Sequence, residues 1–181
     1  MRAKIGHVLP FAEVTVRCEN AEDARERPVV RSIDQAAFGG PDEAELIDAV
    51  RADGAEILSL VAELGPRIVG RILFSRMWID TGSGPVPAVA LAPMAVLPDC
   101  QRRGIGGRLI RTGLDALRAR GERIVIVVGH PAYYPRFGFS SERARPLDSP
   151  FPPEAFMAQD LSPGALDGIR GKVGYSAAFG L

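Results

Sequence analysis

The chain has 181 residues, and its 22 Lys and Arg residues balance its 22 Asp and Glu residues. This length suits one domain with an ordinary hydrophobic core, and the balanced charge excludes a general attraction to nucleic acid or to an anionic membrane. Cys18, Cys100 and two histidines are too few for a disulfide framework or a cysteine-ligated zinc site. We therefore expect small-molecule ligands, no metal, no nucleic acid and the reducing environment of the cytoplasm.

The first residues predict neither a targeting segment nor a membrane anchor. Residues 1–10 lack the long apolar run of a signal peptide, and residues 86–98 are too short and too broken by proline to span a bilayer. We expect a soluble protein in which residues 1–10 form a flexible tail.

The rest of the chain predicts alternating strands and helices. Apolar side chains alternate with polar ones in half-buried strands, and they recur every three or four residues in helices. In chain order we expect a strand at 13–17, helices at 20–38 and 41–54, a hairpin of strands at 56–64 and 67–79, a loop at 80–87, a strand at 88–96, a helix at 104–121 and a strand at 123–128.

The first helix contains the least regular stretch. Asn20 can cap its start through its side chain, and Gly39 with Gly40 ends it. Pro28 removes a backbone donor in the middle of the expected helix, which predicts a kink or a split there.

These elements indicate a mixed α/β fold. The turn at Gly65 and Pro66 makes the early strands antiparallel. The strands at 88–96 and 123–128 are joined by a helix, and such a crossover connects parallel strands. We expect a mostly antiparallel sheet with this one parallel pair, flanked by helices.

The C-terminal part is less regular, because prolines interrupt it. Short apolar patterns at 155–161 and 169–175 predict terminal strands. We expect a single domain over residues 1–181, in which residues 146–181 elaborate the C-terminal end of the same fold.

The glycine-rich turn at 101–107 has the features of an anion site. It follows an apolar strand and opens a helix, so that backbone N–H groups point outward at the positive end of the helix dipole. Its glycines leave room for a diphosphate beside the backbone, and its arginines can donate charge-assisted hydrogen bonds. These residues are Gly104, Gly106, Gly107, Arg102, Arg103 and Arg108. The alternative is that the glycines only permit a tight turn while the arginines are solvated.

Two familiar phosphate loops do not match this turn. A Walker loop ends in Gly-Lys-Ser/Thr and a dinucleotide fingerprint reads Gly-x-Gly-x-x-Gly, and residues 101–107 contain neither. They contain Gln-x-x-Gly-x-Gly between an apolar strand and an amphipathic helix. In this the chain resembles the GCN5-related N-acetyltransferase family. Further stretches at 36–63, 128–139 and 150–161 are similar to the bacterial YhbS-like branch of that family.

The resemblance implies where an acetyl carrier binds. In that family the strand before the loop contacts the pantetheine arm of coenzyme A, and the loop amides hold its pyrophosphate, so acetyl-CoA is the expected co-substrate. By position, the pantetheine and acetyl group belong to Met94, Ala95 and Val96, and the pyrophosphate belongs to Arg102, Arg103, Gly104, Ile105, Gly106 and Gly107. A backbone amide of residues 94–96 is expected to polarise the thioester carbonyl.

The same resemblance implies a proton donor. Many of these transferases carry a tyrosine four residues before a Gly-Phe pair and near the carrier's sulfur, and Tyr134 has that spacing from Gly138. Tyr134 is thus expected to protonate the departing thiolate, with Tyr133 as a packing or pocket residue. The alternative for either tyrosine is a core aromatic whose hydroxyl has a partner.

The general base is open. Several family members use a glutamate on the strand after the central helix, but here Glu122 stands only at the start of that strand. His130, just past the strand, can take a proton near neutral pH directly or through water, or it can be a turn residue. Glu43 and Glu45 can meet a cationic substrate or stay solvated at a helix start.

The resemblance implies a cytoplasmic, acetyl-CoA-dependent N-acetyltransferase that passes the acetyl group directly to a primary amine without a metal. The acceptor can be a small molecule or a peptide, and homodimers are common in such folds. One alternative is a coenzyme A binding or regulatory module that acetylates nothing, motivated by the missing glutamate. Another is a nucleotide-phosphate binder that uses the same turn.

Overall fold

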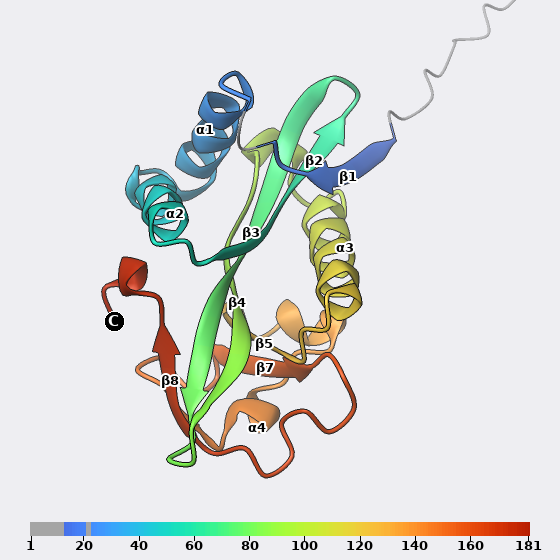
Figure 1. Ribbon diagram of the computed structural model, residues 1–181. Coiled ribbons are helices and arrows are strands. Elements are labelled where there is room, and N and C mark those ends of the chain that lie inside the picture. The colour runs from blue at the N-terminus through green and yellow to red at the C-terminus, as the bar shows by residue number, and fades with distance from the viewer. Residues whose placement is uncertain (1–12, 21–22) are drawn as a thin grey trace, which may run out of the picture.

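The computed structural model describes residues 13–20 and 23–181, in which one sheet has helices on both faces (Figure 1). The strands are β1 (Val14–Cys18), β2 (Glu56–Leu64), β3 (Arg67–Asp80), β4 (Pro85–Val96), β5 (Ile124–Val128), β6 (Leu147–Asp148), β7 (Phe156–Asp160) and β8 (Gly171–Tyr175). The helices are α1 (Glu26–Phe38), α2 (Asp42–Ala52), α3 (Ile105–Ala119) and α4 (Ser141–Ala144), and the short 3-10 turns are η1 (Pro98–Cys100), η2 (Tyr134–Phe137) and η3 (Ala177–Phe179).

The strands lie in the order β1-β2-β3-β4-β5-β7, with β8 paired to β3 and β6 paired to β8. β4 and β5 run parallel, as do the short β6 and β8, and all other pairs are antiparallel. This mixed, mostly antiparallel sheet with a parallel β4–β5 pair confirms the predicted fold class.

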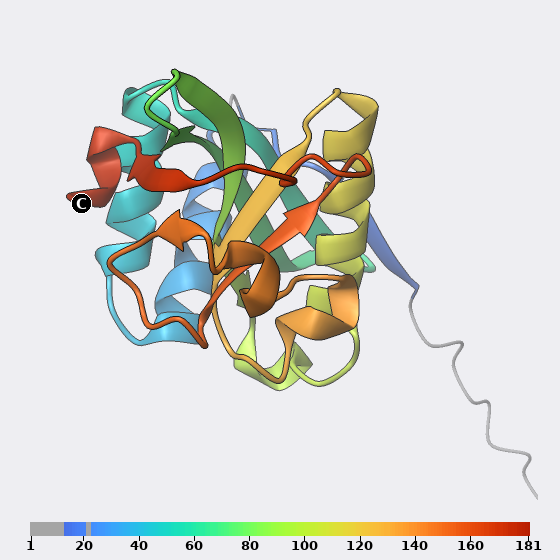
Figure 2. The same ribbon diagram turned by 90° about the horizontal axis from the view of Figure 1, so that it is seen from below.

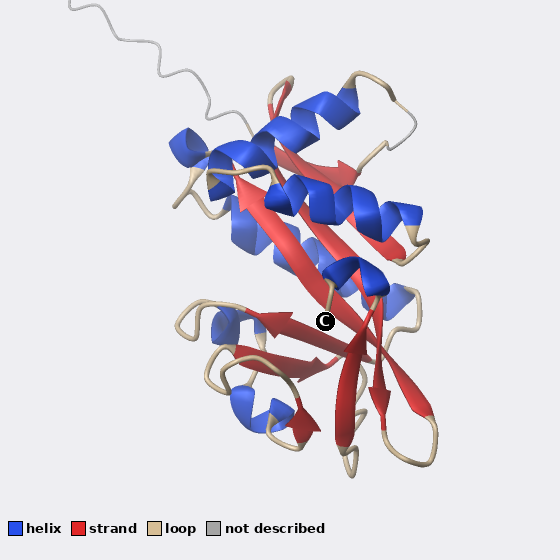
Figure 3. Cartoon of the chain, turned by 90° about the vertical axis from the view of Figure 1, so that its left-hand side faces the viewer, coloured by secondary structure: helices blue, strands red, loops and turns tan. Residues whose placement is uncertain are grey.

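Helices cover the two faces of the sheet with different apolar clusters. Figure 2 shows α1 and α2 on one side of the strands and α3 on the other, and Figure 3 shows α1 and α2 lying together over their face. Leu109 of α3 packs in the cluster of Phe74 of β3, whereas Ile47 and Val50 of α2 pack on Leu73. Neighbouring residues of β3 thus serve opposite faces, as the alternation of side chains along a strand requires.

The first helix differs from its prediction at its start. α1 begins at Glu26, and the residue before its first turn is Arg25 rather than Asn20. Pro28 is therefore the third residue of the helix, where a backbone N–H has no helical partner in any case. The expected kink or split at Pro28 was wrong for this reason, and α1 is continuous to Phe38.

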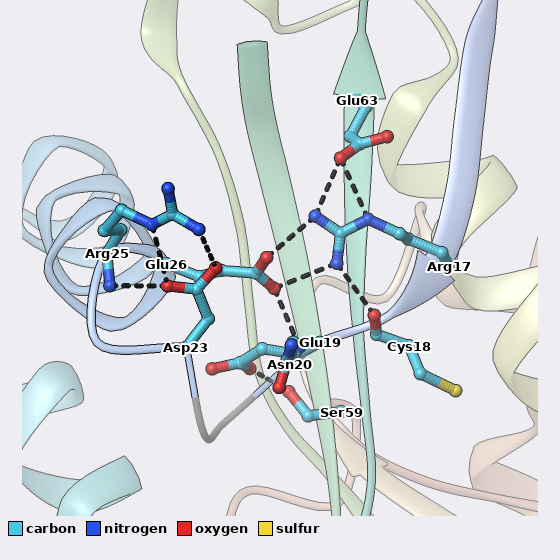
Figure 4. A network of polar contacts seen from close by, with 9 residues as sticks. All are labelled: Arg17, Cys18, Glu19, Asn20, Asp23, Arg25, Glu26, Ser59 and Glu63. Carbon is cyan, nitrogen blue, oxygen red and sulfur yellow. Dashed lines mark hydrogen bonds and ion pairs between the residues drawn. The ribbon is translucent and has the colours of Figure 1, made fainter. Parts of the chain in front are cut away.

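Arg17 of β1 holds the start of α1 against the sheet edge. Its guanidinium donates hydrogen bonds to Glu63 of β2 at 2.9 Å and to Glu26 of α1 at 2.8 and 3.0 Å (Figure 4). Glu26 also accepts the backbone N–H of Asn20 at 2.8 Å. The first residue of α1 is therefore fixed by the two strands at this edge.

The turn between β3 and β4 is shorter than predicted. We expected a loop at 80–87, but β4 begins at Pro85 and pairs with Asp80 of β3, which leaves residues 81–84 as the turn. β4 can begin this early although it contains Pro85 and Pro87. In the described chain these prolines pair only with β3, so the other edge of β4 needs no backbone donor there.

The terminal strands form near the predicted patterns, as β7 and β8, and both join the same sheet. Residues 1–10, expected to be a flexible tail, lie outside the described residues, so a single domain over 1–181 stays a prediction. Within residues 13–20 and 23–181, the structure contains no helix of the length and apolar character needed to cross a membrane.

Candidate active site

A cleft of about 670 Å³ opens between the end of β4, the start of α3 and the turn η2. The predicted cofactor-binding residues that line it are Met94, Ala95, Val96, Arg102, Gly104, Ile105, Gly106 and Gly107. Arg103 is exposed and does not belong to the lining. Phe38 at the end of α1 also lines the cleft. The structure thus brings together the two segments that the sequence assigned to one ligand.

β4 and β5 diverge where the cleft begins. β4 pairs with β5 only between Val89 and Leu91, while it continues along β3 to its last residue. A register shift between Ile72 and Phe74 of β3 marks a bulge in this part of the hairpin. Within the described chain, the edge of β4 that faces away from β3 has no strand partner at residues 94–96. An extended ligand can pair with such an edge as another strand would.

The start of α3 supplies backbone donors. Gly104 precedes the helix with a φ of 81°, and the first helical hydrogen bond runs from the N–H of Arg108 to the carbonyl of Gly104 at 3.0 Å. The N–H groups of residues 105–107 therefore have no acceptor within the helix, and they lie at the positive end of its dipole. This arrangement suits a diphosphate.

Two glycines at this helix start let other side chains pack closely against it. A Cβ atom at Gly106 would lie 2.8 Å from the hydroxyl of Tyr133 and 3.4 Å from Cε of Met94. A Cβ atom at Gly107 would lie 3.2 Å from the ring of Phe137 and 3.3 Å from Nη1 of Arg111. Side chains at these positions would clash with these neighbours, so the glycines are needed for the close packing, and room for a diphosphate beside them stays a prediction from the sequence.

Side chains around the turn fix it and add positive charge. The Nε2 of Gln101 donates a hydrogen bond to the carbonyl of Val96 at 3.0 Å, which ties the turn to the end of β4. Besides Arg102, the cleft is lined by Arg111 and Arg136, which the sequence analysis missed. For Arg111 a signal existed, because it follows Gly107 by four residues and such residues share a helix face.

The two adjacent tyrosines have different surroundings. Tyr133 lines the cleft, whereas Tyr134 is not among the lining residues. The ring of Tyr134 packs on the backbone of Gly129 and meets the ring of Phe139 edge-on at 5.7 Å between centroids. Burial raises the pKa of Tyr134 to about 12, and it also raises the pKa of Tyr133. Among the described residues, none hydrogen-bonds to the Tyr134 hydroxyl.

The possible bases lie outside the cleft lining. His130 is exposed, and its Nδ1 accepts the backbone N–H of Ala132 at 3.2 Å, as a turn residue does. Glu122 accepts two hydrogen bonds from Arg76, at 2.6 and 2.9 Å. Glu43 does not line the cleft, and neither does its neighbour on α2, Glu45.

The part of the chain that the structure describes contains no cluster of side chains suited to binding a metal ion. There, no three His, Cys, Asp or Glu side chains stand close enough to hold an ion together. The absence of a metal from the reaction stays a prediction.

Known proteins are similar to this chain in sequence and in architecture. Residues 20–141 match the family model described as an acetyltransferase (GNAT) domain. The uncharacterized N-acetyltransferase YjhQ of Escherichia coli K12 is 38% identical over 141 residues, which are 74% of this chain and 78% of YjhQ. The uncharacterized N-acetyltransferase YhbS of the same strain is 32% identical over 91% of this chain and 97% of its own length.

Two solved structures carry the same likeness. The E. coli YhbS structure in complex with CoA superposes with a TM-score of 0.85, at 30% identity over 97% of each chain. A Brucella melitensis GNAT family acetyltransferase in complex with acetyl-CoA superposes with a TM-score of 0.76, at 35% identity over 93% of this chain and 99% of that one. Family model, relatives and fold agree over most of the sequence, and the chain therefore belongs to the GNAT family of acetyltransferases.

Proposed function

We propose that this protein transfers the acetyl group of acetyl-CoA directly to a primary amine of a small molecule or a peptide. The observation that carries the proposal is the cleft in which the open backbone donors of residues 105–107 face the unpaired edge of β4 at residues 94–96. In support, the B. melitensis relative was solved with acetyl-CoA and E. coli YhbS with CoA.

Each end of the cleft binds a different part of the coenzyme. The N–H groups of residues 105–107 and the guanidinium of Arg102 hold the pyrophosphate, and Arg103 adds charge from just outside the lining. The pantetheine arm lies along Met94, Ala95 and Val96, where an N–H of β4 polarises the thioester carbonyl. Removing one such preorganised donor costs acyl-transfer enzymes on the order of 3 kcal/mol in barrier height.

Tyr134 is not in the cleft lining, but its ring lies 5.2 Å from that of Tyr133, which is. From this position it protonates the sulfur as the carbon–sulfur bond breaks. A pKa of about 12 keeps its phenol protonated at every pH at which the enzyme would work. The same desolvation that raises the pKa of the phenol also makes a buried thiolate more basic, so the proton transfer does not become steeply unfavourable.

The acceptor amine enters unprotonated, because no carboxylate or imidazole belongs to the described lining of the cleft. The proton that the amine loses as the amide forms passes to water, and water returns a proton to Tyr134. His130 orders the turn that carries Tyr133 and Tyr134, since its carbonyl accepts the N–H of Tyr133 at 2.9 Å. A direct role of His130 in taking up the amine proton through water stays a prediction from the sequence.

The missing carboxylate also favours a second candidate function, a coenzyme A binding or regulatory module that acetylates nothing. Two experiments separate the possibilities. Calorimetry with acetyl-CoA should give binding, and a protein that shows none at high micromolar concentrations does not have the proposed site. A panel of primary amines, read by release of free thiol, should then give turnover with at least one acceptor; binding without turnover supports the regulatory module.

Three expectations about the setting of this activity come from the sequence alone. They are the cytoplasmic location, the possible homodimer and the absence of a nucleic-acid partner, and they stay predictions.

A further inference from the structure

The ring of Tyr134 lies directly against the backbone of Gly129, the residue that follows β5. A Cβ atom at Gly129 would lie 2.7 Å from Cδ2 and 3.1 Å from Cζ of Tyr134, and closer still to Cε2. Side chains do not approach one another this closely in folded proteins. Any residue other than glycine at position 129 therefore forces either its own backbone or the tyrosine ring to move.

Gly129 is required for space rather than for its backbone conformation. It does not have the positive φ that favours glycine at other turns of this chain. Its N–H donates a hydrogen bond to the carbonyl of Ala155 at 2.9 Å, which extends the pairing of β5 with β7 by one residue. Because this bond holds the backbone, the ring of Tyr134 is the group that a larger side chain at 129 displaces.

Ring packing fixes the phenol of Tyr134. Across residues 13–20 and 23–181, no group hydrogen-bonds to its hydroxyl. Its aromatic contacts are edge-on, with ring centroids 5.2 Å from that of Tyr133 and 5.7 Å from that of Phe139. The bare backbone of Gly129 bounds a further side of the ring. Because no described polar group anchors the hydroxyl, its position depends on these contacts.

Gly129 stands where β5 separates from β4. The last pair between the two strands is Leu91 with Val127, and Gly129 lies two residues beyond it on the β5 side. Met94 lies three residues beyond it on β4, where the proposed function places the thioester. The ring that lies against Gly129 is therefore held beside the point at which the two strands separate.

We propose that Gly129 is a positioning residue for the proton donor, because its missing side chain lets the phenol of Tyr134 reach the sulfur of the coenzyme. This inference rests on the proposed function and on the role of Tyr134 within it. It adds a requirement to that role, since a chain that keeps Tyr134 but has a side chain at 129 holds the phenol out of place. Proton transfer needs the donor within hydrogen-bond reach of the acceptor, so a shift of about 1 Å is enough to slow the reaction.

The test is a double-mutant cycle on kcat with a responsive amine, in which Gly129→Ala and Tyr134→Phe are made singly and together. Gly129→Ala should lower kcat by about 10-fold or more, but by no more than Tyr134→Phe does, because a misplaced donor forfeits at most what the donor contributes. The double variant should have the kcat of Tyr134→Phe, since the glycine has no further effect once the hydroxyl is absent. The dissociation constant of acetyl-CoA, measured by calorimetry, should stay near the parent value in all of these proteins.

Gly174→Ala is the matched control and should keep the kcat of the parent. Gly174 also has an ordinary φ and lies in a strand, β8. A Cβ atom there comes no closer than 4.0 Å to a neighbour, which is the carbonyl oxygen of Trp78. A loss of stability alone lowers kcat to the same extent whether or not the Tyr134 hydroxyl is present, so only positioning predicts the non-additive result.

The outcomes separate this inference from the proposed function. A parent-like kcat of Gly129→Ala overturns the positioning role and leaves the acetyltransferase proposal standing. An equal fold-loss with and without the Tyr134 hydroxyl, or weaker binding of acetyl-CoA, shows that Gly129 serves the fold or the cleft, which also overturns it. If Tyr134→Phe retains kcat, the roles of both residues are wrong while the enzyme class stands.

Two further outcomes are decisive. A parent protein that binds acetyl-CoA but acetylates no amine loses the proposed function, and this inference with it. If Gly129→Ala unfolds, combining it with Phe139→Leu gives the ring room to shift, because Phe139 contacts the ring of Tyr134. A parent-like kcat in that protein, measured against Phe139→Leu alone, overturns the inference, and a loss that disappears in the Tyr134→Phe background supports it.

Discussion

The hydroxyl oxygen of Tyr133 lies 2.8 Å from the position that a Cβ atom would take at Gly106. The turn after β5 therefore leans over the first turn of α3, and the space between them is the proposed pyrophosphate cradle. A methyl group at residue 106 would push against Tyr133 and occupy that space.

Gly106→Ala should weaken acetyl-CoA binding at least 10-fold in calorimetry. Its thermal stability should change little, since alanine gains roughly 0.5–1 kcal/mol over glycine in a helix and this offsets a clash with a movable side chain. Gly40→Ala is the control, because a Cβ atom there meets nothing within 4 Å. An unchanged affinity of Gly106→Ala would mean that the cradle is elsewhere.

Tyr134→Phe should lower kcat on a responsive amine by about 100-fold or more, because general acid catalysis contributes on that order. The dissociation constant of acetyl-CoA should stay near the parent value, since Tyr134 is not part of the cleft lining. Tyr133→Phe is the matched control and should change affinity more than kcat. The opposite pattern would transfer the proton-donor role to Tyr133.

Gly113→Ala should destabilise the fold by about 1–3 kcal/mol, as overpacked cores do. A Cβ atom at Gly113 would lie 2.4 Å from the ring of Phe74, which is fully buried between α3 and β3. Urea unfolding measures the loss. Adding Phe74→Leu should recover part of it by making room, and a double variant less stable than the sum of the two single changes would contradict this explanation.

Asp34→Asn should change how stability depends on pH. Burial of Asp34, on the inner side of α1, raises its pKa from the ordinary 3.8 to about 6, although Arg71 of β3 donates a hydrogen bond to it at 3.3 Å. Because the folded state prefers the protonated carboxyl, this contribution is present below about pH 4 and is lost as the pH rises through 6. Relative to Asp34→Asn, the parent should lose roughly 2 kcal/mol of unfolding free energy between pH 4 and 7. Parallel pH profiles in urea unfolding would contradict the shift.

Glu26→Gln should show the opposite sign. The hydrogen bonds from Arg17 hold the pKa of Glu26 below its ordinary value, so its contribution is present above that value and is lost as the pH falls. At pH 7 the variant should be less stable by about 1–2 kcal/mol, since Arg17 is partly exposed. Urea unfolding from pH 7 down to pH 3 should show the two proteins converging, and a constant difference would argue against the ion pair.

The sequence predicted the sheet and the helix start well because their signals are local. Unbroken apolar runs predicted β4 and β5, and the glycines among residues 104–107 predicted the turn that opens α3. The crossover rule then gave the parallel pair without any knowledge of packing. The resemblance to acetyltransferases, confirmed by the family model and the relatives, rests on these same local features.

Contacts between distant parts of the chain decided the rest. The start of α1 at Glu26 depends on hydrogen bonds of Arg17 with Glu26 and Glu63. The residues around Asn20 give no sign of these distant contacts. Tyr133 and Tyr134 are identical, adjacent residues, so the sequence cannot distinguish them. The orientation of η2 relative to α3 decides which of the two rings lines the cleft. The amino-acid sequence by itself determined the fold class and the turn that opens α3, because backbone geometry and hydrophobic periodicity are written in neighbouring residues. The tertiary structure alone decided which charged side chains and rings line the cleft, because those side chains meet only when separate elements pack.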